Sequence, residues 1–217
     1  MMWGAIALGV MSGLLLNMAA DLLPREAGGA SKIRHQARLG IFLLVSVGLC
    51  AYLQRRHGWS SSFFMQAAYC HLLLLIAVID LEHRIVPNVL IASGITLALG
   101  FNFWLATPGL VAAFLGAVVG GGIFLLLALL RRDALGLGDV KLAFLIGMMT
   151  GFPWVLQALT IGILLGGAAA AFLLLARLRG PKQYMPYAPY LVVGCMVTLL
   201  YGHDIAYWYV RAAGLGG

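Results

Sequence analysis

Charged side chains are scarce in this chain of 217 residues: Asp, Glu, Lys and Arg make up only 10% of it, whereas hydrophobic residues make up 63%. Soluble domains average about 25% charged residues. The chain therefore has too few polar groups to cover a surface that faces water. This composition excludes an ordinary soluble globular protein and indicates a membrane protein.

Cysteine is also scarce, and its arrangement excludes two kinds of stabilised fold. Cys50, Cys70 and Cys195 form no CxxC pair and lie within apolar stretches. Three isolated cysteines provide neither a disulfide framework nor a zinc knuckle, so we expect small buried hydrophobes. The N-terminus lacks the basic residues of a cleavable signal peptide, and its apolar run is expected to be a retained first span.

Long apolar runs occupy most of the chain and predict its fold. A membrane span needs about 20 residues, so the runs predict an all-α polytopic membrane protein of about eight transmembrane helices. Residues 1–217 are expected to form a single domain with no sizeable soluble part. The sixth run is the weakest and is interpreted as a half-buried or broken helix. The segments are roughly 3–23, 39–54, 61–79, 88–107, 109–130, 140–151, 154–176 and 188–209.

Glycine recurs at intervals of four residues inside these runs. Small residues at this spacing let helix backbones approach closely in lipid, so we expect these glycines at contacts between helices. The pairs are Gly116 with Gly120, Gly147 with Gly151, and Gly162 with Gly166.

The net charge of +7 is explained by the loops between the runs. If all eight runs cross the membrane, three of the 14 Lys and Arg residues (Arg55, Arg56 and Arg211) fall on one side and the other eleven on the opposite side. The positive-inside rule places the larger set in the cytoplasm and both termini outside. The expected partner is therefore the lipid bilayer and not nucleic acid, and the oligomeric state stays open.

Only seven residues are acidic, and two of them stand at the ends of apolar runs. Asp80 closes the third run in HLLLLIAVID, and Asp139 opens the sixth in LGLGDVKL. By the alternation of spans, both lie at cytoplasmic helix ends. A charge at the centre of a membrane helix costs roughly 2.5–3.5 kcal/mol, and residues kept at that cost usually serve chemistry or ion transport.

Two neighbouring carboxylates suit peptide hydrolysis by water. One holds a proton because like charges repel, and the other can activate water while the protonated acid assists the leaving amine. A proton-coupled transporter or channel is the alternative, because membrane acids also relay ions. Transporters often show internal repeats and midplane acids, neither of which is evident here. An assembly scaffold that has lost activity is a third reading.

Residues beside the two acids are candidates for shaping the site. Gly136 and Gly138 let the backbone bend and a peptide approach, and Asp139 itself can serve as an N-cap. Pro87 is expected to stop one helix and Asn88 to cap the next.

Other polar residues near the acids have less specific expectations. Glu82, with His83 and Arg84, is assigned to headgroup contacts or substrate steering. Lys141 either tunes the acids or binds lipid phosphate. His71, within the third run, is expected to be a hydrogen-bonded core residue and not a metal ligand.

The segment IDLEHRIVPN, followed downstream by GLGDVKL, resembles the two-aspartate signature of type IV prepilin leader peptidases, the GxGD class of intramembrane aspartyl proteases. Two further stretches resemble motifs of that family. GLLLNMAADLLP contains Asn17 and Pro24, and MPYAPYLVVG contains Pro186 and Pro189. The resemblance covers nearly the whole chain.

This resemblance implies that Asp80 and Asp139 are the catalytic pair of an endopeptidase. Its substrates are then prepilins or pseudopilins of type IV pili or type II secretion, in which a short basic leader precedes a small residue and a hydrophobic helix. The enzyme lies in the bacterial inner membrane with its active site facing the cytoplasm. Roles in substrate contact or support are implied for Asn17, Glu82, Pro186 and Pro189.

The chain departs from the family pattern in its first loop and first helix. Many members carry two CxxC pairs thought to hold zinc, but residues 24–38 contain no cysteine. Because structural zinc needs about four ligands, we expect no zinc, and no cofactor for proteolysis. S-adenosylmethionine is expected only if N-methylation of the product is retained. Leu22 stands where the motif usually has arginine, whose role is missing or has moved to Arg25.

Overall fold

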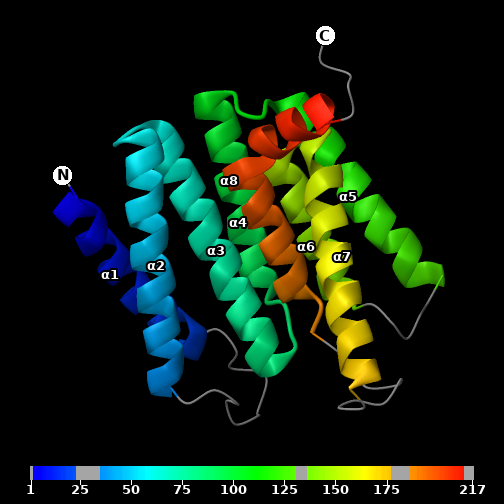
Figure 1. Ribbon diagram of the computed structural model, residues 1–217, viewed down its shortest axis with the longest axis horizontal. Helices are drawn as coiled ribbons and strands as arrows, with labels where there is room; N and C mark the ends of the chain where they lie inside the picture. Colours follow the sequence, from blue (N-terminus) through cyan, green and yellow to red (C-terminus); the bar gives the residue numbers. More distant parts are fainter. Residues whose placement is uncertain (1, 23–34, 131–135, 177–185, 213–217) are drawn as a thin grey trace. The chain divides into compact units, whose positions relative to one another are not determined.

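The computed structural model describes residues 2–22, 35–130, 136–176 and 186–212 (Figure 1). Within these ranges the chain forms eight α-helices and no strand. Seven of the helices are long and apolar enough to cross a membrane, and the exception is the 14-residue α6. The all-α polytopic membrane fold is therefore confirmed. The helices are α1 (Met2–Leu22), α2 (His35–His57), α3 (Ser61–His83), α4 (Asn88–Leu105), α5 (Leu110–Leu130), α6 (Leu137–Thr150), α7 (Trp154–Leu175) and α8 (Ala188–Ala212).

Each expected apolar run corresponds to one helix, and the largest differences are in α2 and α3. Helix α2 begins at His35, so the end of the expected loop at residues 24–38 is helical, while residues 24–34 lie outside the described part. Helix α3 continues beyond Asp80 to His83. It ends where Arg84 adopts a left-handed conformation (φ 58°) and donates its backbone N–H to the Asp80 carbonyl at 2.8 Å.

The chain divides into two compact units, Met1–Thr96 and Leu97–Gly217, which are described separately. In the first unit α1 packs along α2, and α3 contacts both. Gly9 lies at the α1–α2 contact, where an added Cβ would stand 2.6 Å from the Val47 Cα. Such close approach explains why glycine is needed there. The expectation of one domain stays a prediction.

His71 joins α3 to α1 inside this first unit. Its Nδ1 donates to the Ala67 carbonyl at 2.7 Å, and its Nε2 lies 2.9 Å from the Ser12 hydroxyl. The carbonyl can only accept, so Nε2 is the ring nitrogen that accepts from Ser12. His71 is therefore hydrogen-bonded as expected, but it is only partly buried and is not a core residue. The three cysteines are buried and free, as predicted.

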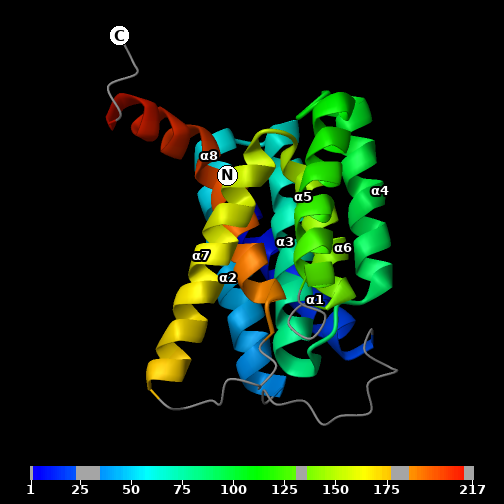
Figure 2. The ribbon, with the colours of Figure 1, turned by 90° about the vertical axis from the view of Figure 1, so that its right-hand side faces the viewer.

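In the second unit α5 packs closely on α6, and α7 runs beside α8 (Figure 2). A Cβ added at Gly120 would lie 2.6 Å from the Ala143 carbonyl oxygen, and Gly116 and Gly147 face each other still more closely. Gly162 and Gly166, on α7, contact α8 and Tyr187, the residue just before α8. The expected glycine contacts are confirmed for these residues. Gly151 differs in part, because it caps α6 with φ 74° and packs against Pro108.

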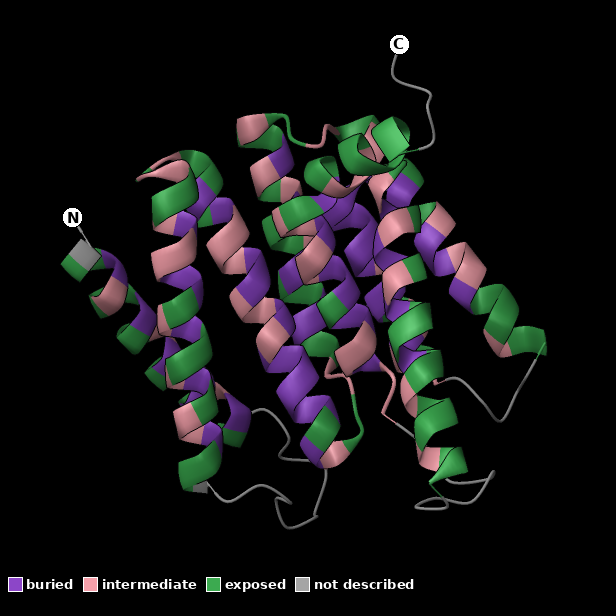
Figure 3. Cartoon of the chain, viewed as in Figure 1, coloured by how far each residue is buried: buried purple, intermediate pink, exposed green. Residues whose placement is uncertain are grey.

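Burial is greatest in the helices that carry the two acids highlighted by the sequence (Figure 3). In α3, 61% of the most apolar window is buried, compared with 22–33% in the other six candidate spans. In α6, nine of 14 residues are buried. Helices α3 and α6 therefore behave as core elements.

Candidate active site

Asp80 occupies the last turn of α3, where its residue surface is only 4% exposed. The helix reaches this point because Leu73, Ile76 and Ile79 are fully buried and the sequence has no helix breaker before Pro87. The structure thus places the first candidate acid in a buried position at a helix end, within the first unit.

Glu82, two residues further along α3, is also buried and forms an ion pair, which fits the expected supporting role and not a contact with lipid headgroups. Arg38 Nη1 donates to Glu82 Oε2 at 3.0 Å. The same guanidinium donates from Nε to Asn17 Oδ1 at 3.0 Å and from Nη2 to Asp21. Asn17, which was expected to contact substrate or to support the site, is therefore buried and hydrogen-bonded to Arg38.

Arg38 was not identified from the sequence. A signal existed in α1, where Asn17 and Asp21 are four residues apart and so share a helix face. An acid and an amide on one face of an apolar helix indicate that a hydrogen-bond donor from another helix packs against that face. The sequence does not reveal which of the nearby basic residues supplies it.

Asp139 lies in the first turn of α6 and is 5% exposed. Its predicted N-cap role is wrong, because the helix begins at Leu137 and Gly136 is the N-cap. Asp139 instead occupies the third helical position, where its carboxylate accepts a hydrogen bond from the Gly136 N–H at 3.4 Å. An acidic residue here also interacts favourably with the positive end of the helix dipole.

The glycines before Asp139 adopt ordinary conformations. Gly136 is extended (φ −79°, ψ 149°), and Gly138 is inside α6. The chain does turn into the helix at Gly136, but neither residue requires the conformational freedom of glycine.

Burial raises the pKa of Asp139 to about 6, and the hydrogen bond from Gly136 opposes that rise. Asp139 lies outside the seven candidate spans. Burial disfavours a charged carboxylate because water no longer solvates it. The protonated form of Asp139 is therefore accessible near neutral pH.

Tyr187 lies close enough to Asp139 for the two groups to interact. Burial raises the pKa of the Tyr187 phenol, and the negative charge of Asp139 raises it further. The Tyr187 ring packs near Phe124, with ring centroids 6.1 Å apart. Sequence reasoning did not single out Tyr187, although it lies in the MPYAPY stretch that carries the family resemblance.

Two prolines flank Tyr187. Pro186 precedes α8, and Pro189 lies in its first turn, where a missing backbone N–H leaves no helical hydrogen bond unmade. Both prolines therefore shape the entry into α8. Their proposed contact with substrate stays a prediction.

The remaining candidates differ in their outcomes. Asn88 was expected to cap α4 but is its first helical residue. The preceding residue, Pro87, supplies the carbonyl that accepts from the Leu90 N–H at 3.1 Å. Lys141 is exposed on α6, and neither of its two expected roles is decided.

The structure thus gathers Asn17, Arg38, Asp21 and Glu82 near the end of α3 that carries Asp80, and Gly136 and Tyr187 near Asp139. The two acids belong to different units, and each half-site is described by itself. The described residues contain no group of three or more His, Cys, Asp or Glu that could hold a metal. The lack of cysteine in residues 24–38 likewise does not fit a four-ligand zinc site.

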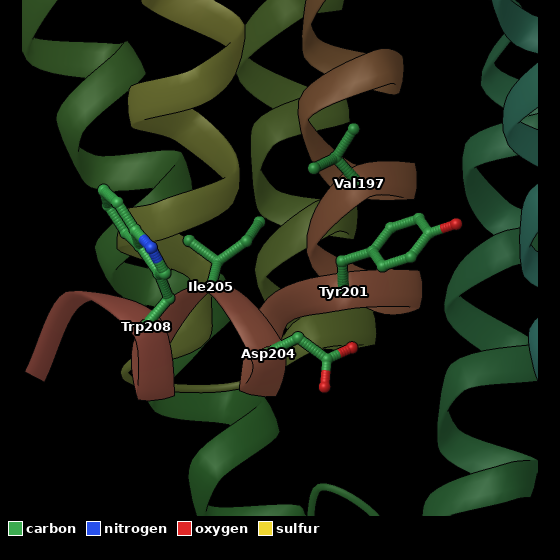
Figure 4. Close-up of a pocket in the computed structure, with 5 residues that line it drawn as sticks. All are labelled: Val197, Tyr201, Asp204, Ile205 and Trp208. Carbon is green, nitrogen blue, oxygen red and sulfur yellow. The ribbon is translucent and has the colours of Figure 1, made fainter. Parts of the chain in front are cut away.

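A hollow of 390 Å³ follows the C-terminal half of α8 (Figure 4) and includes none of the candidate residues. Its lining residues are Val197, Tyr201, Asp204, Ile205 and Trp208. The acids are therefore marked by burial and position, and not by this hollow.

These features define a polytopic helical membrane protein that keeps buried carboxylates at helix ends. The model of the type IV leader peptidase family matches residues 67–171, which include both acids. The match covers just under half of the chain, and it agrees with the resemblance found in the sequence.

Relatives agree with this assignment, and each is named prepilin leader peptidase/N-methyltransferase. The Bacillus subtilis (strain 168) protein is 26% identical, over 78% of this chain and 68% of its own length. The Pseudomonas aeruginosa protein is 31% identical, over 72% of this chain and 57% of its own length. The Stutzerimonas stutzeri protein is 31% identical, over 76% of this chain and 61% of its own length. The chain thus spans about three fifths of the length of these relatives, and no solved structure matches it.

Proposed function

We propose that this chain is an intramembrane aspartyl endopeptidase that removes the leader from prepilins or pseudopilins at the cytoplasmic face of a bacterial inner membrane. The observation that carries the proposal is the burial of Asp80 and Asp139 in terminal helix turns. The third buried acid of the described residues, Glu82, is already matched by Arg38. Asp80 and Asp139 are the acids proposed for chemistry because they are the two aspartates of the signature that the sequence resembles.

Membrane topology supports bringing the two acids to one side. In a chain whose helices cross the bilayer in turn, the C-terminal end of the third helix and the N-terminal end of the sixth lie on the same side. Asp80 is at the first of these ends and Asp139 at the second. A substrate helix lying in the bilayer would present its leader junction at that interface.

The proposed reaction is hydrolysis by water activated between the two carboxyl groups. The ionised acid accepts a proton from water as its oxygen attacks the scissile carbonyl carbon, and the protonated acid donates a hydrogen bond to the carbonyl oxygen. The C–N bond then breaks, and the leaving amine takes a proton from the acid pair. The pair holds one proton before the reaction and one again after the amine has left, and the burial of Asp139 favours a resting state with that proton bound.

Cleavage of a synthetic peptide tests this proposal. The peptide has a short basic leader, a glycine at the junction and a hydrophobic helix, and the purified protein is in detergent. Asp80→Asn and Asp139→Asn each keep the side-chain volume and should abolish cleavage, as read by mass spectrometry. Asp204→Asn, at an exposed position on α8, should cleave normally. An Asn variant that still cleaves would remove that acid from the mechanism.

The names of the relatives also include N-methyltransferase. S-adenosylmethionine would supply the methyl group if that activity is retained here. The same mass spectra, recorded with S-adenosylmethionine present, show whether the new N-terminus gains a methyl group.

A further inference from the structure

Arg38 joins the ends of three helices in the first unit. It lies near the start of α2 and contacts Asn17 and Asp21 in the last turns of α1 and Glu82 in the last turn of α3. The Arg38 side chain is 3% exposed and that of Glu82 is 0% exposed. We call these four residues the Arg38 network.

The geometry of this network requires arginine. Three nitrogens of one guanidinium reach acceptors on two other helices, with N–O distances of 3.0 Å to both Asn17 and Glu82. A lysine is a single point charge at the end of a flexible chain and cannot reproduce this planar fork. The network therefore fixes the three helix ends relative to one another.

Stability alone does not explain such a network. A buried ion pair pays a desolvation penalty and often stabilises a fold no more than apolar residues of the same volume. What it supplies in some proteins is a defined arrangement of the helices, because other arrangements leave a buried charge unmatched. The Arg38 network is placed to do this for the last turn of α3.

That turn is the one that carries Asp80. Glu82 lies two residues after it, and the chain leaves the helix at Arg84, whose N–H binds the Asp80 carbonyl. Terminal turns open most readily, because they have few neighbours to hold them. Arg38 binds this turn through Glu82. Opening of the turn would displace the Asp80 carboxyl.

We propose that Arg38 is a positioning residue that holds Asp80 in place through Glu82. This inference rests on the proposed peptidase function. A displacement of about 1 Å at a catalytic group can lower the rate by roughly a factor of 100. Loss of the network should therefore lower kcat, while substrate binding elsewhere on the protein leaves KM nearly unchanged.

The test uses Arg38→Met combined with Glu82→Gln, which removes both charges and leaves no buried ion unmatched. We expect kcat on the synthetic prepilin peptide to fall about 10- to 100-fold, with KM within roughly twofold of wild type. Hydrogen–deuterium exchange should become faster in the last turn of α3. Arg56→Met is the matched control, because Arg56 is an exposed arginine of the same helix that contacts Tyr52. It should leave kcat and exchange unchanged.

Wild-type kcat and wild-type exchange in the double variant would overturn the proposal and leave the network with a packing role only. If the double variant does not fold, Arg38→Lys decides, because it keeps the charge and loses the fork. It should lower kcat with little change in KM, and a wild-type kcat would overturn the proposal. Failure of the proposed function is recognised separately, by a wild-type protein that does not cleave the peptide or by cleavage that persists in Asp80→Asn.

Discussion

Asp139→Asn is expected to remove a pH dependence from the stability of the protein. Burial raises the pKa of Asp139 from 3.8 to about 6, so the folded state prefers the protonated carboxyl. A group with a raised folded pKa stabilises the fold fully below its unfolded pKa, and this contribution is lost as the pH rises through the folded pKa. For Asp139 the loss runs from about pH 4 to just above pH 6.

The size of the effect follows from the shift. One pKa unit corresponds to about 1.4 kcal/mol, so a shift of roughly two units corresponds to a contribution on the order of 3 kcal/mol. Because Asp139 is 5% exposed, little of this is offset by solvent. The Asn variant has nearly the same shape as the protonated acid and does not ionise.

The measurement is the free energy of unfolding of the wild type minus that of Asp139→Asn, in a neutral detergent from pH 4 to pH 8. Taking the difference cancels the titration of groups that the two proteins share. The difference should fall by about 3 kcal/mol across this range. Parallel curves for the two proteins would refute the reasoning, because they would show that Asp139 ionises without cost in the folded state.

Three further predictions concern helix packing, the neighbour of Asp139 and metal. Gly116→Ala should lower the free energy of unfolding by about 1–3 kcal/mol, because its Cβ would meet the backbone of α6, whereas Gly122→Ala on the same helix meets nothing within 4 Å and should not destabilise. Equal effects would contradict the close α5–α6 contact. Asp139→Asn should lower the pKa of the Tyr187 phenol. The Tyr187 titration is obtained by subtracting the ultraviolet titration of a Tyr187→Phe variant, once in the wild-type background and once in the Asp139→Asn background. An unchanged pKa of Tyr187 would show that the two groups do not interact. Chelators should leave peptide cleavage intact and metal analysis should find no stoichiometric zinc, and loss of cleavage on chelation would contradict our interpretation of the first loop.

The sequence allowed most of the fold to be predicted because membrane spans are long and must be apolar throughout. That Gly116 and Gly120 lie at a contact between helices was also predictable, since they share one helix face, but the sequence did not show that the partner is α6. The ends of helices were harder to place. Asp139 is not an N-cap, because Gly136 begins the turn. Local preferences at a helix end differ by little between neighbouring residues, and tertiary packing decides among them.

The candidate site shows a different limit of sequence reasoning. Asp80 and Asp139 could be singled out because an acid in an apolar run is costly wherever it lies. The partner of Glu82 could not be identified from the sequence, because Arg38 is 44 residues away along the chain. An ion pair between distant residues depends on how the helices pack, and no periodicity records it.

The contacts of Arg38 also bear on the arginine that the first-helix motif usually carries. Leu22 holds that position and is 53% exposed, while Arg25 lies outside the described residues. A guanidinium nevertheless reaches the end of α1, because Arg38 donates to Asn17 and Asp21 from the neighbouring helix α2. Since what α1 offers is a pair of acceptors one turn apart, the donor need not come from α1 itself. The same guanidinium also binds Glu82 in the turn that carries Asp80, a contact that ties the first-helix motif to the first candidate acid.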